Sequence, residues 1–192
     1  IILKYFDGEE ELQISAKSDF SPVTLADCAA EKYIVEALRT LTPGIDIVAE
    51  ELAAQGEICA SNDENISTYW LIDPLDGTKE FISGGLDFTV NIGLIEEGVP
   101  TLGVVYAPAK DELYAGHGPG TAIRGSERGT REKSIHVRTP PSAGLIVASS
   151  KSHGHSKKID TFLQNFKVQK IIRGASSLKI CWIAAGKADV YP

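Results

Sequence analysis

Residues 69–81 read YWLIDPLDGTKEF, and this stretch constrains the chain more than any other. An apolar strand runs directly into Asp73 and Asp76, which stand three positions apart in the sequence. Two carboxylates at the end of a buried strand repel each other and lose solvation, so a counterion is expected beside them. A divalent cation that prefers hard oxygen ligands, Mg²⁺ or Mn²⁺, offsets both costs. The stretch therefore predicts a metal site at a strand end.

A neutral oxygen and a second strand end extend the predicted site. Pro74 removes one backbone donor and holds the turn, so the carbonyl of Leu75 can serve as a further ligand. Upstream, the segment IDIVAEE is typical of a short apolar strand that ends at two glutamates. If this strand pairs with YWLI, Glu50 arrives beside Asp73. The carboxylates would then suffice for two cations bridged by one side chain.

Gly77 and Thr78 follow the aspartates and open a turn or helix, where backbone amides can donate to a phosphate. The Thr78 hydroxyl would lie beside the metals. With Glu50 as a base, it would orient a metal-bound water for in-line attack on phosphorus. The plain alternative is an Asx-turn, in which both aspartates only cap the strand-to-helix turn. The second acidic strand end and the Gly-Thr pair favour the metal site.

Composition bounds the class of protein. With 192 residues, 43% of them hydrophobic, the chain can form one substantial core or two small ones. A net charge of −7 gives no basic face for a nucleic-acid polymer or anionic lipid, so a small phosphorylated substrate is the favoured partner. Three cysteines without a CxxC spacing disfavour a disulfide framework and a structural zinc site. Without a membrane span or signal peptide in the sequence, a cytoplasmic protein is expected, and peripheral association with the inner membrane stays open.

A long amphipathic helix is predicted from a Thr24 cap to about Leu41, with Pro43 ending it. Asp27 falls inside its apolar side, which is an unusual place for a carboxylate. The other members of the predicted apolar arc are Cys28, Ile34, Val35, Leu38 and Leu41.

The predicted order of strands and helices changes near residue 142 and divides the chain into two domains. Apolar runs after residue 87 predict an antiparallel meander covered by helices, hence an N-terminal α+β metal-binding domain over residues 1–141. Residues 142–192 predict the start of a C-terminal α/β domain, because strands and helices alternate there. The alternating segments are LIVASS, KKIDTFLQNF, VQKIIRG, SSLKICWIAAG and ADVYP. The chain begins at Ile1 inside an apolar segment, contains no methionine and stops at Pro192, so a piece of a longer protein is expected.

WLIDPLDGTKEF, with VAEE upstream and GASSLKICWIAAGKADVYP downstream, resembles the inositol monophosphatase superfamily of lithium-sensitive, magnesium-dependent phosphomonoesterases over nearly the whole chain. Glu80, where the inositol enzymes usually have Asn, together with FTVNIGLIEEGVPTLGVVYAP and SSKSH, is most similar to the bacterial 3′(2′),5′-bisphosphate nucleotidases. The resemblance implies a layered αβαβα sandwich of the sugar-phosphatase type, incomplete at both ends here. It also implies two or three Mg²⁺ per site, with Mn²⁺ as a substitute, and a possible homodimer.

The implied reaction removes the 3′-phosphate of 3′-phosphoadenosine 5′-phosphate, a by-product of sulfate assimilation, and leaves AMP. Inositol phosphates and fructose 1,6-bisphosphate are alternative substrates. The family also has a W-D-x-A-A-G-like segment beyond the residue matching Pro192, whose aspartate completes the second metal site. The resemblance implies that the catalytic residues are Glu50, Thr78 and Asp27, and that the metal ligands are Glu50, Asp73, Leu75 and Asp76. It implies that the phosphate or substrate is bound by Gly77, Thr78, Gly174, Ala175 and Ser176. Lys17 matches a lysine of a flexible loop.

Other candidates and classes stay open. His153 and His155 lie in a polar loop, where exposure is more common than metal binding. Lys151 or Ser152 is a candidate for a substrate phosphate. Lys179 and Arg173 either meet a second phosphate or are solvated. Aspartyl-phosphate chemistry of the haloacid dehalogenase type is disfavoured, because its aspartates are two apart rather than three. A non-catalytic metal- or phosphate-binding module is the alternative from another class.

Overall fold

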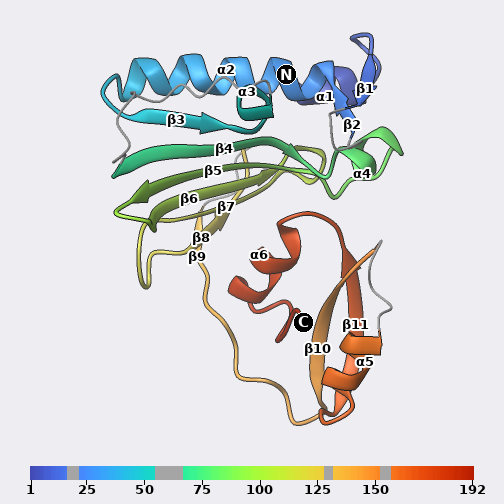
Figure 1. Ribbon diagram of the computed structural model, residues 1–192. Coiled ribbons are helices and arrows are strands. Elements are labelled where there is room, and N and C mark those ends of the chain that lie inside the picture. The colour runs from blue at the N-terminus through green and yellow to red at the C-terminus, as the bar shows by residue number, and fades with distance from the viewer. Residues whose placement is uncertain (17–21, 55–66, 128–131, 152–156) are drawn as a thin grey trace.

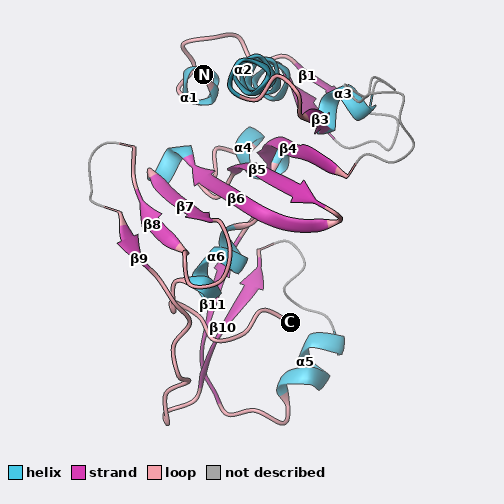
Figure 2. Ribbon diagram, turned by 90° about the vertical axis from the view of Figure 1, so that its left-hand side faces the viewer, coloured by secondary structure: helices cyan, strands magenta, loops and turns pink. Residues whose placement is uncertain are grey.

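The computed structural model describes residues 1–16, 22–54, 67–127, 132–151 and 157–192, and these form stacked layers (Figure 1). Helix α2, Leu25–Leu41, lies over one face of a large sheet. Helix α6, Leu178–Ala184, lies beneath the sheet and contacts the strand pair β10–β11. Helix α5, Lys157–Leu163, lies on the other side of this pair in both ribbon views (Figure 2). The order helix, sheet, helix, sheet, helix confirms the expected layered sandwich.

The large sheet is mixed. In the described chain it has seven strands in the order β3-β4-β5-β6-β7-β8-β9. Only β3 and β4 run parallel, and every later neighbour is antiparallel, which confirms the predicted meander. Its strands are β3 Asp46–Ala49, β4 Thr68–Asp76, β5 Thr89–Glu96, β6 Val99–Ala107, β7 Glu112–Gly116, β8 Ile123–Gly125 and β9 Lys133–Ser134.

Short elements surround the sheet at the end where the acidic residues gather. They are helix α1 Ile2–Phe6, the hairpin of β1 Ile14–Ala16 and β2 Pro22–Thr24, helix α3 Glu50–Ala54, helix α4 Thr78–Ile82 and the 3₁₀ turn η1 Pro108–Lys110. The strand predicted over IDIVAEE, residues 45–51, is therefore three residues shorter than expected, because it begins at Asp46 and its two glutamates begin α3.

Helix α2 begins where the sequence predicts. The Thr24 hydroxyl accepts a hydrogen bond from the Ala26 amide, and the Asp27 carboxylate accepts from the Thr24 amide at 2.8 Å. This capping box satisfies amides that the first helical turn leaves unpaired. Asp27 is 2% exposed, so its predicted place on the buried side is confirmed.

The predicted apolar arc of α2 is wrong at its edges. Cys28 is exposed, and Leu41, the last helical residue, is 75% exposed. Glu31 instead occupies the buried side at 4% exposure. Its carboxylate accepts hydrogen bonds from the amides of Glu51 at 2.7 Å and Leu52 at 2.9 Å. A count of apolar side chains misses such a residue, because the hydrogen bonds that permit its burial come from another element.

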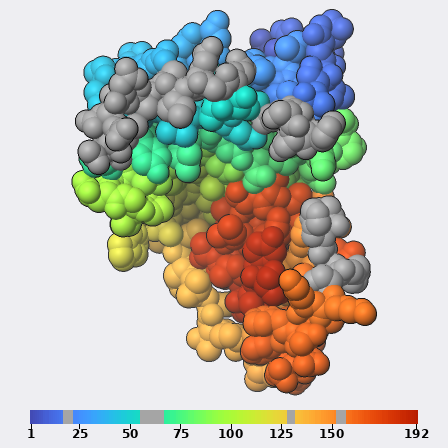
Figure 3. Space-filling model, in the orientation of Figure 1, coloured from blue at the N-terminus to red at the C-terminus, as the bar shows by residue number. Residues whose placement is uncertain are grey.

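Three apolar clusters hold the layers together. One packs α2 on the first strands through Val35, Leu38, Ile47, Ala49, Trp70 and Ile72. A second joins α1, α2 and α4 through Ile2, Ala26, Ala30, Leu75, Phe81 and Phe88. The third joins the large sheet to the C-terminal part through Ala107, Tyr114, Ala148, Leu178, Cys181, Trp182 and Ala188. The space-filling view accordingly shows the red C-terminal part in contact with the green sheet (Figure 3).

The C-terminal part contains β10, Leu145–Ser150, and β11, Val168–Gly174, which pair in parallel with α5 between them in sequence. The predicted alternation is thus confirmed as far as α6. The predicted strand over ADVYP is wrong, since only an isolated bridge joins Val190 to Val147. Two backbone hydrogen bonds form there, from Ala148 to Val190 and from Asp189 to Ile146, and the Asp189 side chain also binds Arg138 and the Ile146 amide. The domain boundary at 141/142 stays a prediction. No helix in the described residues is long and apolar enough to cross a membrane.

Candidate active site

The parallel pairing of β3 and β4 brings the first two acids together. Ala49, the last residue of β3, is the register partner of Ile72, and the residues that follow them, Glu50 and Asp73, interact through their side chains. Glu50 begins α3 directly after β3, and Glu31 holds the amides of that helix start. The predicted approach of Glu50 to Asp73 is confirmed.

A bulge at the end of β4 shapes the turn between the aspartates. Asp73 pairs with Asn91 and Asp76 pairs with Thr89, so three steps on β4 match two on β5. The Leu75 amide donates to Oδ1 of Asp73 at 3.2 Å, while the Leu75 side chain is buried at 2% exposure. The Asx-type turn that was the plain alternative is therefore present, and it forms part of a larger cluster.

The pKa of Asp73 is raised by its buried and negatively charged surroundings. Burial raises the pKa of Asp73 most, and the charges of Glu50 and Asp76 with a hydrogen bond to Glu50 raise it further, to about 8. An acid in this state holds a proton at neutral pH unless a cation takes its place. The cluster thus has an excess of negative charge that a divalent cation would neutralise.

Thr78 joins this cluster to the buried carboxylate of α2. Its hydroxyl oxygen lies 3.2 Å from Oδ1 of Asp27 and 3.2 Å from the carbonyl oxygen of Leu75. The other oxygen of Asp27, Oδ2, accepts from the Thr24 hydroxyl at 2.5 Å. Burial raises the pKa of Asp27, although its hydrogen bonds from Thr24 and Thr78 lower it in part. One carboxylate therefore caps a helix and orients the hydroxyl beside the acids.

Asp76 is held by the C-terminal part. Its Oδ2 accepts hydrogen bonds from the amide and the hydroxyl of Ser177, both at 2.9 Å. The hydroxyl of Ser176 donates to the carbonyl oxygen of Asp76 at 2.9 Å. Gly77 follows with φ +96°, and a Cβ on it would lie 2.2 Å from Oγ of Ser176. Glycine is thus required here both by its backbone conformation and by the close approach of Ser176.

A pocket of about 440 Å³ opens between the two parts of the chain. Six of the predicted site residues line it: Glu50, Asp76, Gly77, Thr78, Ala175 and Ser176. Pro22, Lys79, Glu80, Ser83, Ser150 and Lys151 complete the lining. Asp73 lines a neighbouring cavity of about 330 Å³ together with Asn91 and Ser177. The volume of the larger pocket suits a small molecule.

Several predicted residues lie outside the pocket lining. Gly174 packs against Trp182, since a Cβ on it would come 2.4 Å from the indole ring, so the structure gives it a packing position. Lys179 is 6% exposed and donates to the Ser176 carbonyl oxygen at 2.7 Å, so the solvated alternative is wrong for it. Arg173 is exposed, as that alternative expects. Lys17, Ser152, His153 and His155 fall outside the described residues.

Sequence reasoning missed four residues that shape the site: Glu31, Asp87, Asn91 and Ser177. Ser177 follows a predicted site residue directly, and this adjacency was the available signal. The positions of Glu31, Asp87 and Asn91 depend on strand pairing and helix packing, which no local motif reveals.

The donor chemistry fits a hard divalent cation. Glu50, Asp73 and the Leu75 carbonyl offer oxygen ligands, and Oδ1 of Asn91 is buried without a hydrogen-bond partner among the described residues. Over the described ranges, no three side chains of His, Cys, Asp and Glu are gathered to hold a metal by themselves. Asp76 directs Oδ2 at Ser177, while Asp73 and Glu50 interact through a side-chain hydrogen bond. The metal-ligand assignments stay predictions.

A family model described as the inositol monophosphatase family matches residues 1–192, which include every residue of the pocket and the acid cluster. The chain belongs to the inositol monophosphatase family. This is a family of metal-dependent phosphatases, so the acid cluster lies in a family whose chemistry requires a cation. The resemblance drawn from the sequence is confirmed.

Curated members of the family match the full chain. The protein named 3′(2′),5′-bisphosphate nucleotidase CysQ of Escherichia coli (strain K12) is 42% identical over 193 residues, which cover 100% of this chain and 74% of that protein. The protein of the same name from Buchnera aphidicola is 40% identical and is covered to 69%.

Solved structures agree with the fold. The extragenic suppressor protein suhB from Bartonella henselae superposes with a TM-score of 0.77 and 26% identity, over 99% of this chain and 71% of that one. CysQ from Bacteroides thetaiotaomicron superposes with a TM-score of 0.66 and 30% identity, over 84% of this chain and 65% of that one. The layers described above are therefore the fold of this family.

Proposed function

We propose that the protein hydrolyses phosphomonoesters with the help of Mg²⁺, and that its substrate is 3′-phosphoadenosine 5′-phosphate, which yields AMP and phosphate. The observation that carries the chemistry is the Thr78 hydroxyl, held by Asp27 beside the Glu50–Asp73 pair. The substrate rests on the 42% identity, over the whole chain, to a protein named for this nucleotidase activity.

Each residue of the cluster has a proposed role. Glu50, Asp73 and the Leu75 carbonyl would hold the cation, and Asp76 would complete the set at a second position. When bound, divalent cations stabilise the charge that develops on the phosphoryl oxygens and make water a better nucleophile. Mn²⁺ is the expected substitute for Mg²⁺, because it accepts the same oxygen ligands.

The chain's own residues orient the reaction. The Thr78 hydroxyl donates a hydrogen bond to Asp27, so the lone pairs of its oxygen are left to accept a hydrogen bond from the attacking water. Glu50, which lines the pocket, takes the proton that this water releases. The water oxygen forms a new bond to phosphorus, the ester P–O bond breaks, and the leaving oxygen takes a proton from solvent. Ala175 and Ser176 line the substrate side of the pocket.

Phosphate release tests the proposal directly. Turnover is measured with 3′-phosphoadenosine 5′-phosphate, inositol 1-phosphate and fructose 1,6-bisphosphate, each with Mg²⁺, with EDTA, and with Mg²⁺ and lithium. We expect kcat/KM to favour the nucleotide, and both EDTA and lithium to abolish turnover. Preference for one of the other two substrates would keep the mechanism and replace the substrate. No release from any of the three would leave the metal- or phosphate-binding module as the better account.

Assembly of the protein is proposed from family resemblance alone, which suggests a homodimer. Sedimentation of the purified protein at several concentrations tests this proposal. A sedimentation coefficient that stays at the monomer value would exclude the homodimer.

A further inference from the structure

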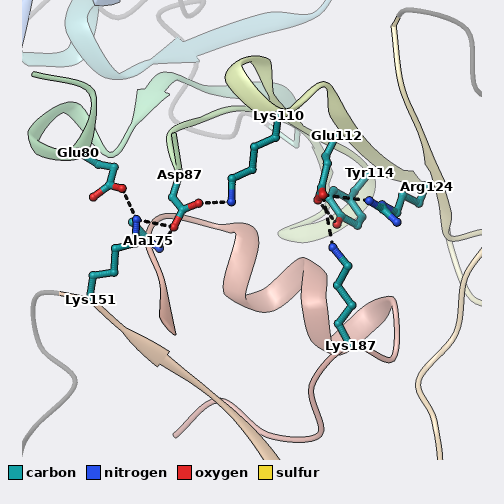
Figure 4. A network of polar contacts seen from close by, with 9 residues as sticks. All are labelled: Glu80, Asp87, Lys110, Glu112, Tyr114, Arg124, Lys151, Ala175 and Lys187. Atoms are coloured by element: carbon teal, nitrogen blue, oxygen red, sulfur yellow. Dashed lines mark hydrogen bonds and ion pairs between the residues drawn. The ribbon is translucent and has the colours of Figure 1, made fainter. Parts of the chain in front are cut away.

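A buried carboxylate outside the acid cluster joins the two parts of the chain. Asp87 lies between α4 and β5 and is 4% exposed. Its Oδ1 forms an ion pair with Lys110 at the end of η1, and its Oδ2 lies 2.8 Å from the ammonium of Lys151 at the end of β10. The same Oδ2 accepts a hydrogen bond from the Ala175 amide at 3.3 Å. Figure 4 shows Asp87 between the two lysines, with Ala175 beside Lys151.

The backbone of Asp87 also lies close to the turn at Gly77. The carbonyl oxygen of Asp87 lies 3.5 Å from the position that a Cβ on Gly77 would occupy. The main chain of Asp87 therefore lies near the turn after Asp76, and its side chain contacts the β11–α6 junction. That junction carries Ser176 and Ser177, which hold Asp76.

Lys110 fixes the carboxylate from the other side. Its ammonium lies 5.9 Å from the ring centroid of Trp182 on α6, in the range of a cation–π contact. Trp182 in turn packs against Gly174, the last residue of β11. The start of the junction is thus linked to Asp87 twice: Gly174 through Lys110 and the indole of Trp182, and Ala175 by a direct hydrogen bond.

We propose that Asp87 is a positioning residue for the phosphatase reaction. Its carboxylate holds the wall of the pocket formed by Ala175 and Ser176 at a set distance from Asp76 and Thr78. This inference deepens the proposed function and rests on it wherever turnover is the readout. Asp87 lines neither of the two cavities described above, so it acts through Ala175 and Lys151 rather than on the substrate.

Three variants separate positioning from general stability. Asp87→Asn keeps the size of the side chain and removes its charge, while Asp87→Glu keeps the charge and adds one methylene. Glu112→Gln is the matched control, because Glu112 also gathers several partners, Tyr114, Arg124 and Lys187, at a distance from the pocket (Figure 4). Steady-state kinetics with 3′-phosphoadenosine 5′-phosphate and hydrogen exchange of the amides of residues 175–177 are measured for all of them.

For Asp87→Asn we expect KM to rise about tenfold with kcat changed less than about threefold, since a loosened wall weakens ground state and transition state alike. Exchange at residues 175–177 should accelerate by about tenfold. Asp87→Glu should restore both values to within about threefold, and Glu112→Gln should leave both at the wild-type level. If Asp87→Asn fails to fold, Lys110→Met removes one partner of the carboxylate and should shift KM and exchange in the same direction by a smaller factor.

The inference is overturned if Asp87→Asn and Glu112→Gln change KM and local exchange equally, or if the Ala175 amide keeps its wild-type protection in Asp87→Asn. If the wild-type protein releases phosphate from none of the substrates, the proposed function fails on its own. Hydrogen exchange then decides alone whether Asp87 holds the pocket wall.

Discussion

The hydroxyl oxygen of Thr78 lies 3.2 Å from Oδ1 of Asp27, although 51 positions separate the two residues in the chain. Because Oδ2 of Asp27 accepts hydrogen bonds from Thr24, the carboxylate cannot turn away from Thr78 without uncapping α2. The helix start and the proposed water-orienting hydroxyl therefore share one side chain.

Removal of the Thr78 hydroxyl should separate chemistry from folding. Thr78→Val keeps the branched shape, so we expect kcat to fall by roughly 100-fold and the free energy of unfolding to fall by only about 1 kcal/mol. Thr78→Ser, which keeps the hydroxyl, should stay within about tenfold of wild type. Phosphate release and thermal unfolding measure the two quantities. Equal kcat values for Thr78→Val and Thr78→Ser would show that the hydroxyl of Thr78 has no role in the mechanism.

Asp73→Asn should abolish stabilisation by Mg²⁺. A ligand that binds only the folded protein adds about 2.7 kcal/mol at one hundred times its Kd, so the wild-type Tm should rise with Mg²⁺ and return with EDTA. Asparagine is neutral beside Glu50 and Asp76 without taking up a proton, so the metal-free Tm of the variant should equal or exceed that of wild type. Glu96→Gln, at the far end of β5, is the control and should respond as wild type does. A full Mg²⁺ response in Asp73→Asn would contradict the ligand assignment.

Gly77→Ala should cost more than an ordinary glycine substitution. Gly77 and Gly84 both have positive φ, +96° and +76°, but only at Gly77 does a Cβ meet Oγ of Ser176 at 2.2 Å. We expect a loss of about 1 kcal/mol for Gly84→Ala from backbone strain and about 3 kcal/mol for Gly77→Ala. Adding Ser176→Ala to Gly77→Ala should recover part of the difference, as chemical denaturation will report. Equal losses at the two glycines would show that Ser176 gives way freely.

Glu31→Gln should weaken the start of α3 and, through it, the position of Glu50. Two backbone amides donate to the Glu31 carboxylate, so we expect a loss of about 1 to 3 kcal/mol in the free energy of unfolding and a fall in kcat of about tenfold. Glu36→Gln, on the exposed side of the same helix, should change neither value. If Glu31→Gln leaves kcat unchanged, the hydrogen bonds of Glu31 to the start of α3 do not contribute to catalysis.

Stability at acidic pH should depend on Asp87. Burial alone would raise the pKa of Asp87, but the hydrogen bonds and charges of Lys110 and Lys151 outweigh it and hold the pKa below its usual value. A carboxyl with a lowered folded-state pKa contributes stability above its unfolded pKa of about 3.9, and this is lost as the pH falls through the folded value. The Tm difference between wild type and Asp87→Asn should therefore be largest near pH 6 and shrink toward pH 3. A difference that stays constant over this range would contradict the ion-pair account.

Local patterns predicted the elements that carry the chemistry. The strand before Asp73, the Thr24 cap and the register that brings Glu50 beside Asp73 all follow from apolar runs and short motifs. The burial of Glu31 and the link from Asp87 to Ala175 could not be predicted in this way. Both depend on hydrogen bonds between elements distant in sequence, and Ala175 lies 88 positions after Asp87.

The last strand over ADVYP and the edges of the α2 arc show the opposite error. An alternating or apolar pattern predicts a strand or a buried face, but the outcome depends on which neighbours are present to complete it. At Val190 one bridge forms, and no layer among the described residues covers the side chain of Leu41, which is 75% exposed.

The separation of Asp76 from Ser177 by 101 positions has a consequence for synthesis of the protein. A ribosome completes all the acids of the cluster when it has added residue 76, yet it must translate a further hundred residues before the serines that hold Asp76 emerge. At roughly 5 to 20 residues per second this takes about 5 to 20 seconds. During that interval the nascent chain carries its charged strand ends without their serine partners, and a cation or a chaperone that shields them would act at this stage of translation.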